Sequence, residues 1–551
     1  MSAQPTILSP EAGESYRKAG LWGDRLIVDH VDAHARRAPH KLAIADSRET
    51  IDYFELVRRS ENLAAGMLAL GVGPGDTIAV RAPNWAELPI SHLAANRVGA
   101  IFLPLSTGFG ATELSHLLAK SRARVLITTP DDEFGVRDFL KKQRSHFPDL
   151  QYVVCLRTTP VTDELAFDEL VRDNTWRTLP GVERLAASRS HPDAPSHVMV
   201  SSGTTGLPKC SLFCDNNTLV KVLLQYCGSV ANVGSDDIAA AIAPAGTGAT
   251  GYNYPILAPL LVGGSTIMLE HWRGSHADDA LRLIETHRCT YAVVVPTQLS
   301  KLIAIPHVKD FDLSRLRLIT NSGAKLPVSV AEAAERLFGA VIQSVYGCSE
   351  AGAATMTSVT DRPEKRLATA GRALVGQEVV VKNETGVILS RNQIGEVCWR
   401  GANKSYGFLN DPESTRLVWD AEGWINSGDL GIIDDEGYLS IVGRKKDMII
   451  RGGQNINPRA IEEALLRHPG VVDVAVTAAS DPVLGERVCA FVVPRSSNEP
   501  PTLAELSRFV IAEGHAKWNR PEILVIVDDL PRNAGGKVDK SRLIALQRSA
   551  A

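Results

Sequence analysis

Residues 201–209 read SSGTTGLPK and hold two serines, two threonines, two glycines and one lysine within nine positions. They follow a short β-like run, SHVMV at 196–200. In such a loop, glycines let backbone N–H groups converge on an oxygen anion, hydroxyl groups donate hydrogen bonds, and a lysine adds positive charge. The spacing is not the P-loop pattern G-x-x-x-x-G-K-S/T, because Lys209 comes three residues after Gly206. The nine residues alone leave two interpretations open, a phosphate-binding loop and an ordinary turn.

The composition indicates a globular protein with more than one folded unit. The chain has 551 residues, of which 44% are hydrophobic and 22% are charged, and this length exceeds that of one ordinary domain. The formal net charge of −4 argues against nucleic acid or an anionic membrane as a partner. We expect no signal peptide in the first 30 residues, and no apolar run reaches the ~18–20 residues that span a bilayer. The sequence therefore predicts a cytoplasmic protein.

Helix and strand patterns alternate through the first part of the chain. Periodicity predicts helices at 53–72 and 85–100, strands at 77–83 and 101–105, and a helix followed by a strand within 111–129. Strands separated by helices of this length pair in parallel, and the helices cover the sheet faces. The prediction is a large α/β N-terminal domain with layered sheets and helices.

A basic, glycine-bearing stretch, GRKKDMIIRGGQNI, begins at residue 443 and marks a change in pattern. We place the domain boundary here, between a first domain of residues 1–444 and a second of residues 445–551. The second domain is predicted to be a small, mobile α+β unit, and its length is ordinary for a domain. Its expected elements are helices at 458–470 and 502–514 and strands at 471–479, 486–494 and 522–531.

Four further motifs follow SSGTTGLPK in order. They are YGCSEAG (346–352), INSGDLG (425–431), GRKKD (443–447) and PRNAGGK (531–537). With these motifs the chain resembles the superfamily of adenylate-forming enzymes, which comprises acyl- and aryl-CoA ligases, stand-alone aryl-acid–AMP ligases, adenylation domains of peptide synthetases and firefly-type luciferases. The resemblance extends from about residue 25 to 545. It implies an AMP-forming ligase that uses ATP and Mg²⁺ to turn a carboxylic acid into an acyl-adenylate and then passes the acyl group to a thiol.

The resemblance also implies a role for each nucleotide-binding motif. The opening loop would hold the β- and γ-phosphates through Ser201, Ser202, Gly203, Thr204, Thr205, Gly206 and Lys209. In NSGAKLP at 321–327, Gly323 and Ala324 would line the adenine, on which Tyr346 would stack, with Gly347 in the same nucleotide-binding set. Ser349 would contact the α-phosphate region, and Glu350 would hold Mg²⁺, since a hard cation prefers anionic oxygen.

Four further positions match the family near and beyond the domain boundary. Asp429 would accept hydrogen bonds from the ribose hydroxyls, and Arg444 would assist there. Lys537 would be the catalytic lysine that bridges the carboxylate and the α-phosphate as charge develops. Lys446 matches the hinge about which the small domain turns between the adenylation and thioester-forming orientations.

The acyl pocket is expected along APAGTGATGYNYPIL at 243–257. YNYP resembles HNYP of the aryl-acid–AMP ligases, which makes Asn253 a ring-contacting residue and Tyr252 a gate towards the pantetheine tunnel. Gly246, Gly248 and Gly251, with Gly323, would leave a wide cavity for a bulky cyclic or aromatic acid. The alternative is that these glycines only shape a loop. The absence of Lys and Arg from 243–257 suggests that the remote end of the acid is not an anion.

RGGQNINP at 451–458 matches the segment that lies beside the pantetheine tunnel in the family. The acceptor of the acyl group is expected to be coenzyme A, because free coenzyme A is the commonest acceptor in family members with this segment and this length. A carrier-protein phosphopantetheine and a partner ligase that receives the adenylate are the alternatives. A non-catalytic nucleotide-binding protein is a further alternative, although such a protein would have lost Lys537. A homodimer is expected by analogy alone.

Overall fold

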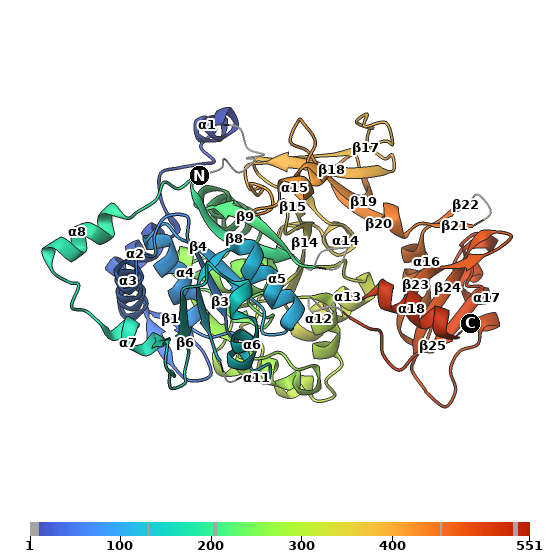
Figure 1. Cartoon of the computed structure of the whole chain (residues 1–551). Helices are drawn as coiled ribbons and strands as arrows, with labels where there is room; N and C mark the ends of the chain where they lie inside the picture. Colours follow the sequence, from blue (N-terminus) through green and yellow to red (C-terminus); the bar gives the residue numbers. More distant parts are fainter. Residues whose placement is uncertain (1–9, 131, 202–206, 452–453, 533–537, 551) are drawn as a thin grey trace. The chain divides into compact units, whose positions relative to one another are not determined.

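The computed structural model describes residues 10–130, 132–201, 207–451, 454–532 and 538–550, without the side chains of residues 455, 541 and 547–550 (Figure 1). The chain divides into two compact units, one formed by Met1–Glu378 with Arg400–Ile425 and the other by Val379–Trp399 with Asn426–Ala551. The predicted boundary between residues 444 and 445 stays a prediction. Six predicted site residues lie outside the described residues, namely Ser202, Gly203, Thr204, Thr205, Gly206 and Lys537.

The first unit contains a seven-stranded sheet in the order β7-β6-β5-β3-β4-β8-β9. Its strands are β3 (Thr77–Arg81), β4 (Ile101–Leu105), β5 (Ala123–Thr128), β6 (Tyr152–Cys155), β7 (Glu164–Ala166), β8 (Pro195–Ser201) and β9 (Lys209–Cys214). All neighbours pair in parallel except β8 and β9, which are antiparallel. Every residue of β3 and β4 is buried, as expected for parallel strands covered on both faces.

A nine-stranded sheet in the same unit has the order β16-β15-β14-β13-β12-β10-β11-β1-β2. Its strands are β1 (Leu42–Ala45), β2 (Thr50–Asp52), β10 (Ile238–Ala241), β11 (Ser265–Met268), β12 (Tyr291–Val294), β13 (Leu318–Asn321), β14 (Val341–Cys348), β15 (Gly352–Met356) and β16 (Arg372–Ala373). Its six central strands, from β14 to β1, are parallel, and both ends of the sheet finish in antiparallel strands. The fold therefore carries two parallel sheets in one unit.

The helices of this unit flank its sheets, except that α1 and α8 lie at the edge of the unit (Figure 1). They are α1 (Pro10–Lys18), α2 (Ile27–Arg37), α3 (Tyr53–Ala69), α4 (Glu87–Arg97), α5 (Ala111–Ser121), α6 (Val136–Gln143), α7 (Phe167–Arg172), α8 (Leu179–Ala187), α9 (Asp215–Leu219), α10 (Ala258–Val262), α11 (Asp278–Thr286), α12 (Pro296–Ile303), α13 (Val328–Phe338), α14 (Pro363–Ala368) and α15 (Pro412–Val418). The unit also has two wider π-type helices. η2 (Val220–Val230) directly follows α9, and η3 (Ala249–Leu257) leads directly into α10. Short 3₁₀ turns lie at η1 (Arg144–His146), η4 (Gly274–His276) and η5 (Val308–Asp310).

The two sheets share one apolar core. Ile78 and Val80 of β3 pack in the same cluster as Ala241 of β10, together with side chains of α3, α4, η2 and η3. The alternate residues face outward, because successive side chains of a strand point to opposite faces. Ala79 therefore packs with α5 and α6, and Ala240 packs with α11, α12 and α13. This alternation builds the layered arrangement of helices and sheets.

The second unit is an α+β fold built on two sheets. The four-stranded sheet has the order β17-β18-β19-β20. The division of the chain assigns residues 377–378 of β17, 400–401 of β18 and 425 of β19 to the first unit. In the five-stranded sheet, β22-β21-β24-β23 are neighbours and β25 pairs with β24. The elements are β17 (Gln377–Lys382), β18 (Gly395–Gly401), β19 (Ile425–Ile433), β20 (Leu439–Arg444), η6 (Lys445–Asp447), β21 (Ile449–Arg451), β22 (Gln454–Ile456), α16 (Pro458–Leu465), β23 (Val471–Asp481), β24 (Gly485–Pro494), α17 (Leu503–Ala512), η7 (Lys517–Asn519), β25 (Ile523–Ile526) and α18 (Lys540–Ala550).

The predicted fold class is confirmed. The helices and strands expected between residues 53 and 129 correspond to α3, β3, α4, β4, α5 and β5, and the parallel pairing of β3 with β4 and β5 is as expected. The elements expected after residue 458 correspond to α16, β23, β24, α17 and β25. No helix within the described ranges is both long and apolar enough to cross a membrane.

Candidate active site

The structure brings two of the predicted motifs into direct contact. Ser201 is the last residue of β8, and Glu350 lies in the turn that joins β14 to β15. The Ser201 hydroxyl donates a hydrogen bond to Oε1 of Glu350 over 3.1 Å, although the two residues are 149 positions apart in sequence. β8 and β14 belong to different sheets and both end here. In α/β folds such carboxyl ends of parallel strands are the usual place for ligands.

Lys209 lies opposite Ser201 across the β8–β9 hairpin. The two residues are direct partners in the antiparallel register, and the loop between them is the SSGTTGLPK motif. The Lys209 ammonium lies 4.7 Å from the centre of the Phe408 ring. A lysine ammonium over an aromatic face is attracted by the ring electrons. The described ends of the motif therefore present one hydroxyl and one ammonium side by side.

The predicted adenine-lining residues leave the same edge of the nine-stranded sheet. Tyr346 and Gly347 lie near the end of β14, and Gly323 and Ala324 follow the neighbouring parallel strand β13. Gly323 and Ala324 are exposed, and Gly323 has a φ of +86° that favours glycine. A Cβ at Gly347 would lie 2.3 Å from the carbonyl oxygen of Gly352, so hairpin packing alone requires glycine at 347.

In the second unit, the structure pairs the two predicted ribose residues. Asp429 of β19 and Arg444 of β20 are direct partners in the antiparallel register. Nε of Arg444 donates a hydrogen bond to Oδ1 of Asp429 over 3.0 Å. Lys446, the predicted hinge, is exposed in the single turn η6 that follows β20.

The glycines of the expected acyl segment differ in what surrounds them. A Cβ at Gly246 would lie 2.2 Å from the backbone nitrogen of Ser106, and a Cβ at Gly251 would lie 1.9 Å from the carbonyl oxygen of Pro244. Close backbone packing therefore explains the missing side chain at both positions, which is the alternative left open by the sequence. A Cβ at Gly248 would lie only 3.5 Å from Oγ of Ser349, so this glycine faces the site.

Asn253 and Tyr252 both lie in η3 and are both buried. Nδ2 of Asn253 lies 3.6 Å from the sulfur of Met199, two residues before Ser201 on β8. The Tyr252 hydroxyl bonds to Nδ1 of His92 over 2.9 Å, and its ring packs 5.4 Å from that of Phe102. The proposed gate role of Tyr252 stays a prediction.

The sequence matches a known family over most of its length. The sequence model described as AMP-binding enzyme matches residues 31–409, and that of the AMP-binding enzyme C-terminal domain matches residues 460–537. The chain belongs to the AMP-binding enzyme family. The resemblance to the adenylate-forming superfamily is thereby confirmed.

Two relatives and one solved structure illustrate the similarity of this AMP-binding enzyme. The medium-chain fatty-acid–CoA ligase of Escherichia coli is 34% identical over 529 residues, covering 96% of this chain and 91% of that protein. A Mycobacterium tuberculosis propanoyl:CoA ligase, whose acid carries a 7a-methyl-1,5-dioxo-octahydro-1H-inden-4-yl group, is 33% identical over 522 residues, covering 94% and 98%. The crystal structure of the anthranilate CoA ligase AuaEII with anthranoyl-AMP has a TM-score of 0.85 at 23% identity, covering 96% and 98%, and supports the fold.

Sequence reasoning missed a buried lysine beside the acyl segment of this AMP-binding enzyme. Lys221 of η2 is fully buried, and its Nζ lies 3.3 Å from the sulfur of Met199 and 4.4 Å from the centre of the Phe213 ring. Burial lowers the pKa of the Lys221 ammonium from 10.5 to about 7. The sequence signal was a single lysine inside the apolar run LVKVLL at 219–224, which lies outside the segment considered for the acyl pocket.

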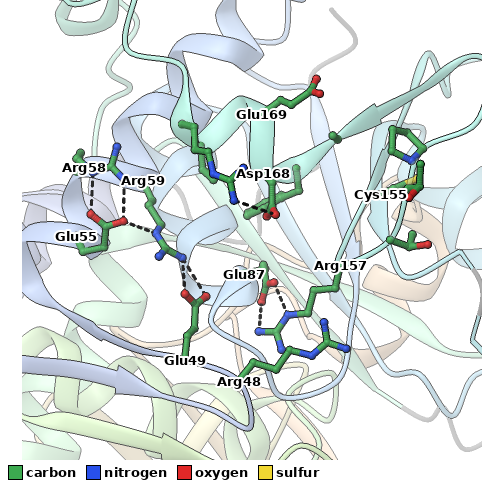
Figure 2. Close-up of a pocket in the computed structure, with 17 residues that line it drawn as sticks. Arg48, Glu49, Glu55, Arg58, Arg59, Glu87, Cys155, Arg157, Asp168 and Glu169 are labelled. Atoms are coloured by element: carbon green, nitrogen blue, oxygen red, sulfur yellow. Dashed lines mark hydrogen bonds and ion pairs between the residues drawn. The ribbon is translucent and has the colours of Figure 1, made fainter.

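A separate pocket of about 720 Å³ lies away from these residues, among α3, α7 and the loop after β6 (Figure 2). Figure 2 shows that its charges face one another: Arg59 bonds to Glu49 and Glu55, and Arg157 bonds to Glu87. None of the predicted site residues that the structure describes lines this pocket. Because these charges are already paired, we assign no ligand to it.

Proposed function

We propose that this AMP-binding enzyme is an AMP-forming acid–thiol ligase that acts on a bulky cyclic carboxylic acid and transfers it to coenzyme A. The single observation that carries this proposal is the contact between Ser201 and Glu350. It joins the phosphate-loop motif to the YGCSEAG motif at the carboxyl ends of two sheets. The pairing of Asp429 with Arg444 supports it independently in the second unit.

The proposed reaction has two balanced steps. A carboxylate is a poor electrophile, because its charge repels nucleophiles. In the first step a carboxylate oxygen attacks the α-phosphorus of ATP and pyrophosphate leaves, which gives the acid an AMP leaving group. In the second step a thiolate attacks the acyl carbon and AMP leaves. Positioning and charge stabilisation supply most of the catalysis in such phosphoryl chemistry.

The side chains at the site fit these needs. Ser201, Lys209 and residues 202–206 between them would bind the terminal phosphates, and Lys537 would neutralise the two reacting anions. The Glu350 carboxylate and Ser201 hydroxyl are both oxygen donors of the kind that Mg²⁺ prefers. Bound there, Mg²⁺ would supply positive charge against the phosphate oxygens. Tyr346 would stack on the adenine.

The proposal of a bulky cyclic acid rests on the residues that surround Gly248 in the acyl segment. Gly248 and Asn253 both approach Met199, and Gly248 also approaches Ser349, so an acid held near Ser349 would meet small or flexible groups there. The relative that ligates an octahydroindenyl propanoic acid also favours a large ring system. The fatty-acid ligase relative makes a linear acid the competing choice.

The test is pyrophosphate release from Mg-ATP with aryl, alicyclic, polycyclic and fatty acids, each with and without coenzyme A. We expect multiple turnovers only with coenzyme A and a cyclic acid, together with an acyl-CoA product. Pyrophosphate release without an acyl-CoA product would indicate that a carrier protein or a partner enzyme, and not coenzyme A, is the acceptor. Preference for linear acids would overturn the proposed acid class.

Substituting Asp429→Asn is expected to raise the KM for ATP by about 10-fold, since a charge-assisted hydrogen bond to a hydroxyl is worth about 1.5 kcal/mol. The wild-type enzyme should show a similar increase in KM with an ATP analogue that lacks a ribose hydroxyl. For the variant, replacing ATP by this analogue should raise KM little further. Asp435→Asn is the control, because Asp435 bonds to Asn392 in the same unit. If the increases in KM caused by the variant and by the analogue were additive, Asp429 would not be the residue that binds the ribose hydroxyls.

Substituting Lys446→Pro is expected to slow one half-reaction about 10-fold more than the other, because proline fixes φ near −65° and restricts the proposed hinge. Adenylation is measured as the rate of pyrophosphate release. Thioester formation is measured as the rate at which acyl-CoA forms from supplied acyl-adenylate. Lys446→Ala is the control and should keep the ratio of the two rates. Equal slowing of both steps by proline would count against a hinge at this residue.

A further inference from the structure

Lys221 is a buried lysine that has no anionic partner among the described residues. Its side chain has no exposed surface, and its described contacts are a thioether sulfur and an aromatic ring. No described carboxylate forms an ion pair with it. Buried charges in proteins are ordinarily paired or bound to a metal, because desolvation of an isolated ammonium is costly. A thioether is only a weak acceptor. The position therefore lacks the strong acceptor that an ammonium needs.

This ammonium lies on the face of the β8–β9 hairpin that carries the site. Side chains alternate along a strand, so His197, Met199 and Ser201 project from one face of β8. Phe213 pairs with His197, and Ser211 pairs with Met199 in the register. Two residues span about 6.6 Å of strand, which places Met199 one short step behind Ser201. Lys221 contacts Met199 and Phe213 at this depth.

Met199 separates Lys221 from the acyl segment. Its sulfur lies 3.3 Å from Nζ of Lys221 and 3.6 Å from Nδ2 of Asn253. Its terminal methyl would lie 3.4 Å from a Cβ at Gly248, which in turn approaches Ser349. A methionine side chain is unbranched and flexible. A shift of this one side chain would therefore join Lys221 to the space beside Ser349.

Ser211 adds a second unsatisfied polar group at the same place. Its hydroxyl is fully buried and has no hydrogen-bond partner among the described residues. Unpaired buried hydroxyl groups are uncommon in native proteins. His197, the other titratable group near Lys221, is already bonded to Ser196 and Thr218. Its burial lowers its pKa well below 6.5, so it supplies no opposite charge.

We propose that Lys221 and Ser211 bind an acceptor oxygen at the end of the acid remote from its reacting carboxylate. The substrate is then a cyclic acid with a ring ketone or a second carboxylate, both of which accept hydrogen bonds from an ammonium. This inference rests on the proposed function and deepens it. It differs from the sequence expectation of a remote end without an anion, because the cation comes from η2 rather than from residues 243–257.

The experiment compares three acids that differ at one position. They are 3-cyclohexylpropanoate, 3-(4-oxocyclohexyl)propanoate and 3-(4-carboxycyclohexyl)propanoate, and the readout is kcat/KM for acid-dependent ATP–pyrophosphate exchange. Wild type is expected to prefer the oxo or the carboxy acid over the unsubstituted acid by about 10-fold or more, because an unpaired polar site rejects an analogue that lacks the acceptor. The preferred acid identifies whether a ketone or a carboxylate is recognised.

Lys221→Met should reduce that preference to about threefold or less, since methionine keeps the length of the side chain and removes the donor. Lys404→Met is the matched control. Lys404 is also a buried lysine, but its Nζ already bonds to the carbonyl oxygen of Gly423 over 3.2 Å, so the preference should persist. Ser211→Ala should reduce the preference as well, and it keeps the test available if Lys221→Met does not fold.

The outcomes separate this inference from the function beneath it. Absence of exchange with every acid, these three and the wider panel, would overturn the ligase proposal itself. Exchange with a wild-type preference for the unsubstituted acid, or with a preference that survives both Lys221→Met and Ser211→Ala, would overturn the role of Lys221 and leave the ligase intact.

Discussion

Replacing Glu350 with Gln is expected to lower acid-dependent ATP–pyrophosphate exchange by about 10²-fold or more, the usual effect of removing a group that stabilises transition-state charge. Glutamine keeps the shape of the side chain and can still accept a hydrogen bond from Ser201, whose hydroxyl lies 3.1 Å from Glu350. The variant loses the negative charge that the proposed Mg²⁺ site needs. It should also need a higher Mg²⁺ concentration for half-maximal rate.

Two variants make this prediction specific. Ser201→Ala removes the neutral partner and is expected to cost only about 10-fold, since one hydroxyl hydrogen bond is lost. Glu364→Gln is the control, because Glu364 is an exposed carboxylate in α14. An exchange rate for Glu350→Gln within threefold of wild type, with an unchanged Mg²⁺ requirement, would remove Glu350 from the proposed metal site.

Replacing Lys537 with Ala is expected to lower adenylation by about 10³-fold, because the lysine would neutralise two anions that must approach each other. Acyl-CoA formation from supplied acyl-adenylate should fall far less, since that step has no pyrophosphate leaving group. Single-turnover rates of the two half-reactions, measured separately, check this difference.

The control for Lys537→Ala is Lys517→Ala, which removes an exposed lysine of the same unit. It should leave both half-reactions near the wild-type rates. A Lys537→Ala enzyme that retains adenylation would contradict the assigned role, and so would one that loses both half-reactions to the same degree.

Periodicity predicted the elements whose sequence pattern matches their surroundings. The helices α3 and α5 follow from apolar residues that repeat every three to four positions, and the strands β3, β4 and β5 follow from short, largely apolar runs. The antiparallel hairpin of β8 and β9 was not predicted. Its second strand, KCSLFC at 209–214, is too short and too mixed in polarity to be separated from the loop before it.

Contacts between distant residues lay beyond the sequence. The motifs placed Ser201 and Glu350 in one site by resemblance, but only the fold shows that the end of β8 meets the turn after β14. Likewise, glycine at 246 and 251 has the same sequence appearance as glycine at 248. Backbone atoms of distant or neighbouring loops fill the space at 246 and 251, whereas Ser349 and Met199 lie near 248.

Lys221 shows why the sequence analysis of the acyl pocket was incomplete. Pocket residues were sought in one contiguous segment, and the cation comes from a helix about 30 residues earlier in the sequence. A lone lysine in an apolar helical run usually extends its ammonium to the surface. Here Lys221 lies at the start of η2 between the buried residues Val220 and Val222, so the ammonium stays buried.

The most direct test of the central claim is the exchange of labelled pyrophosphate into ATP in the absence of any thiol. Reversible formation of an acyl-adenylate predicts exchange that requires both Mg²⁺ and a cyclic carboxylic acid. Glu350→Gln and Lys537→Ala should lower this exchange about 10²-fold and 10³-fold, respectively. Acid-dependent release of ADP and phosphate without exchange would show that the enzyme does not form an adenylate, and it would contradict this account.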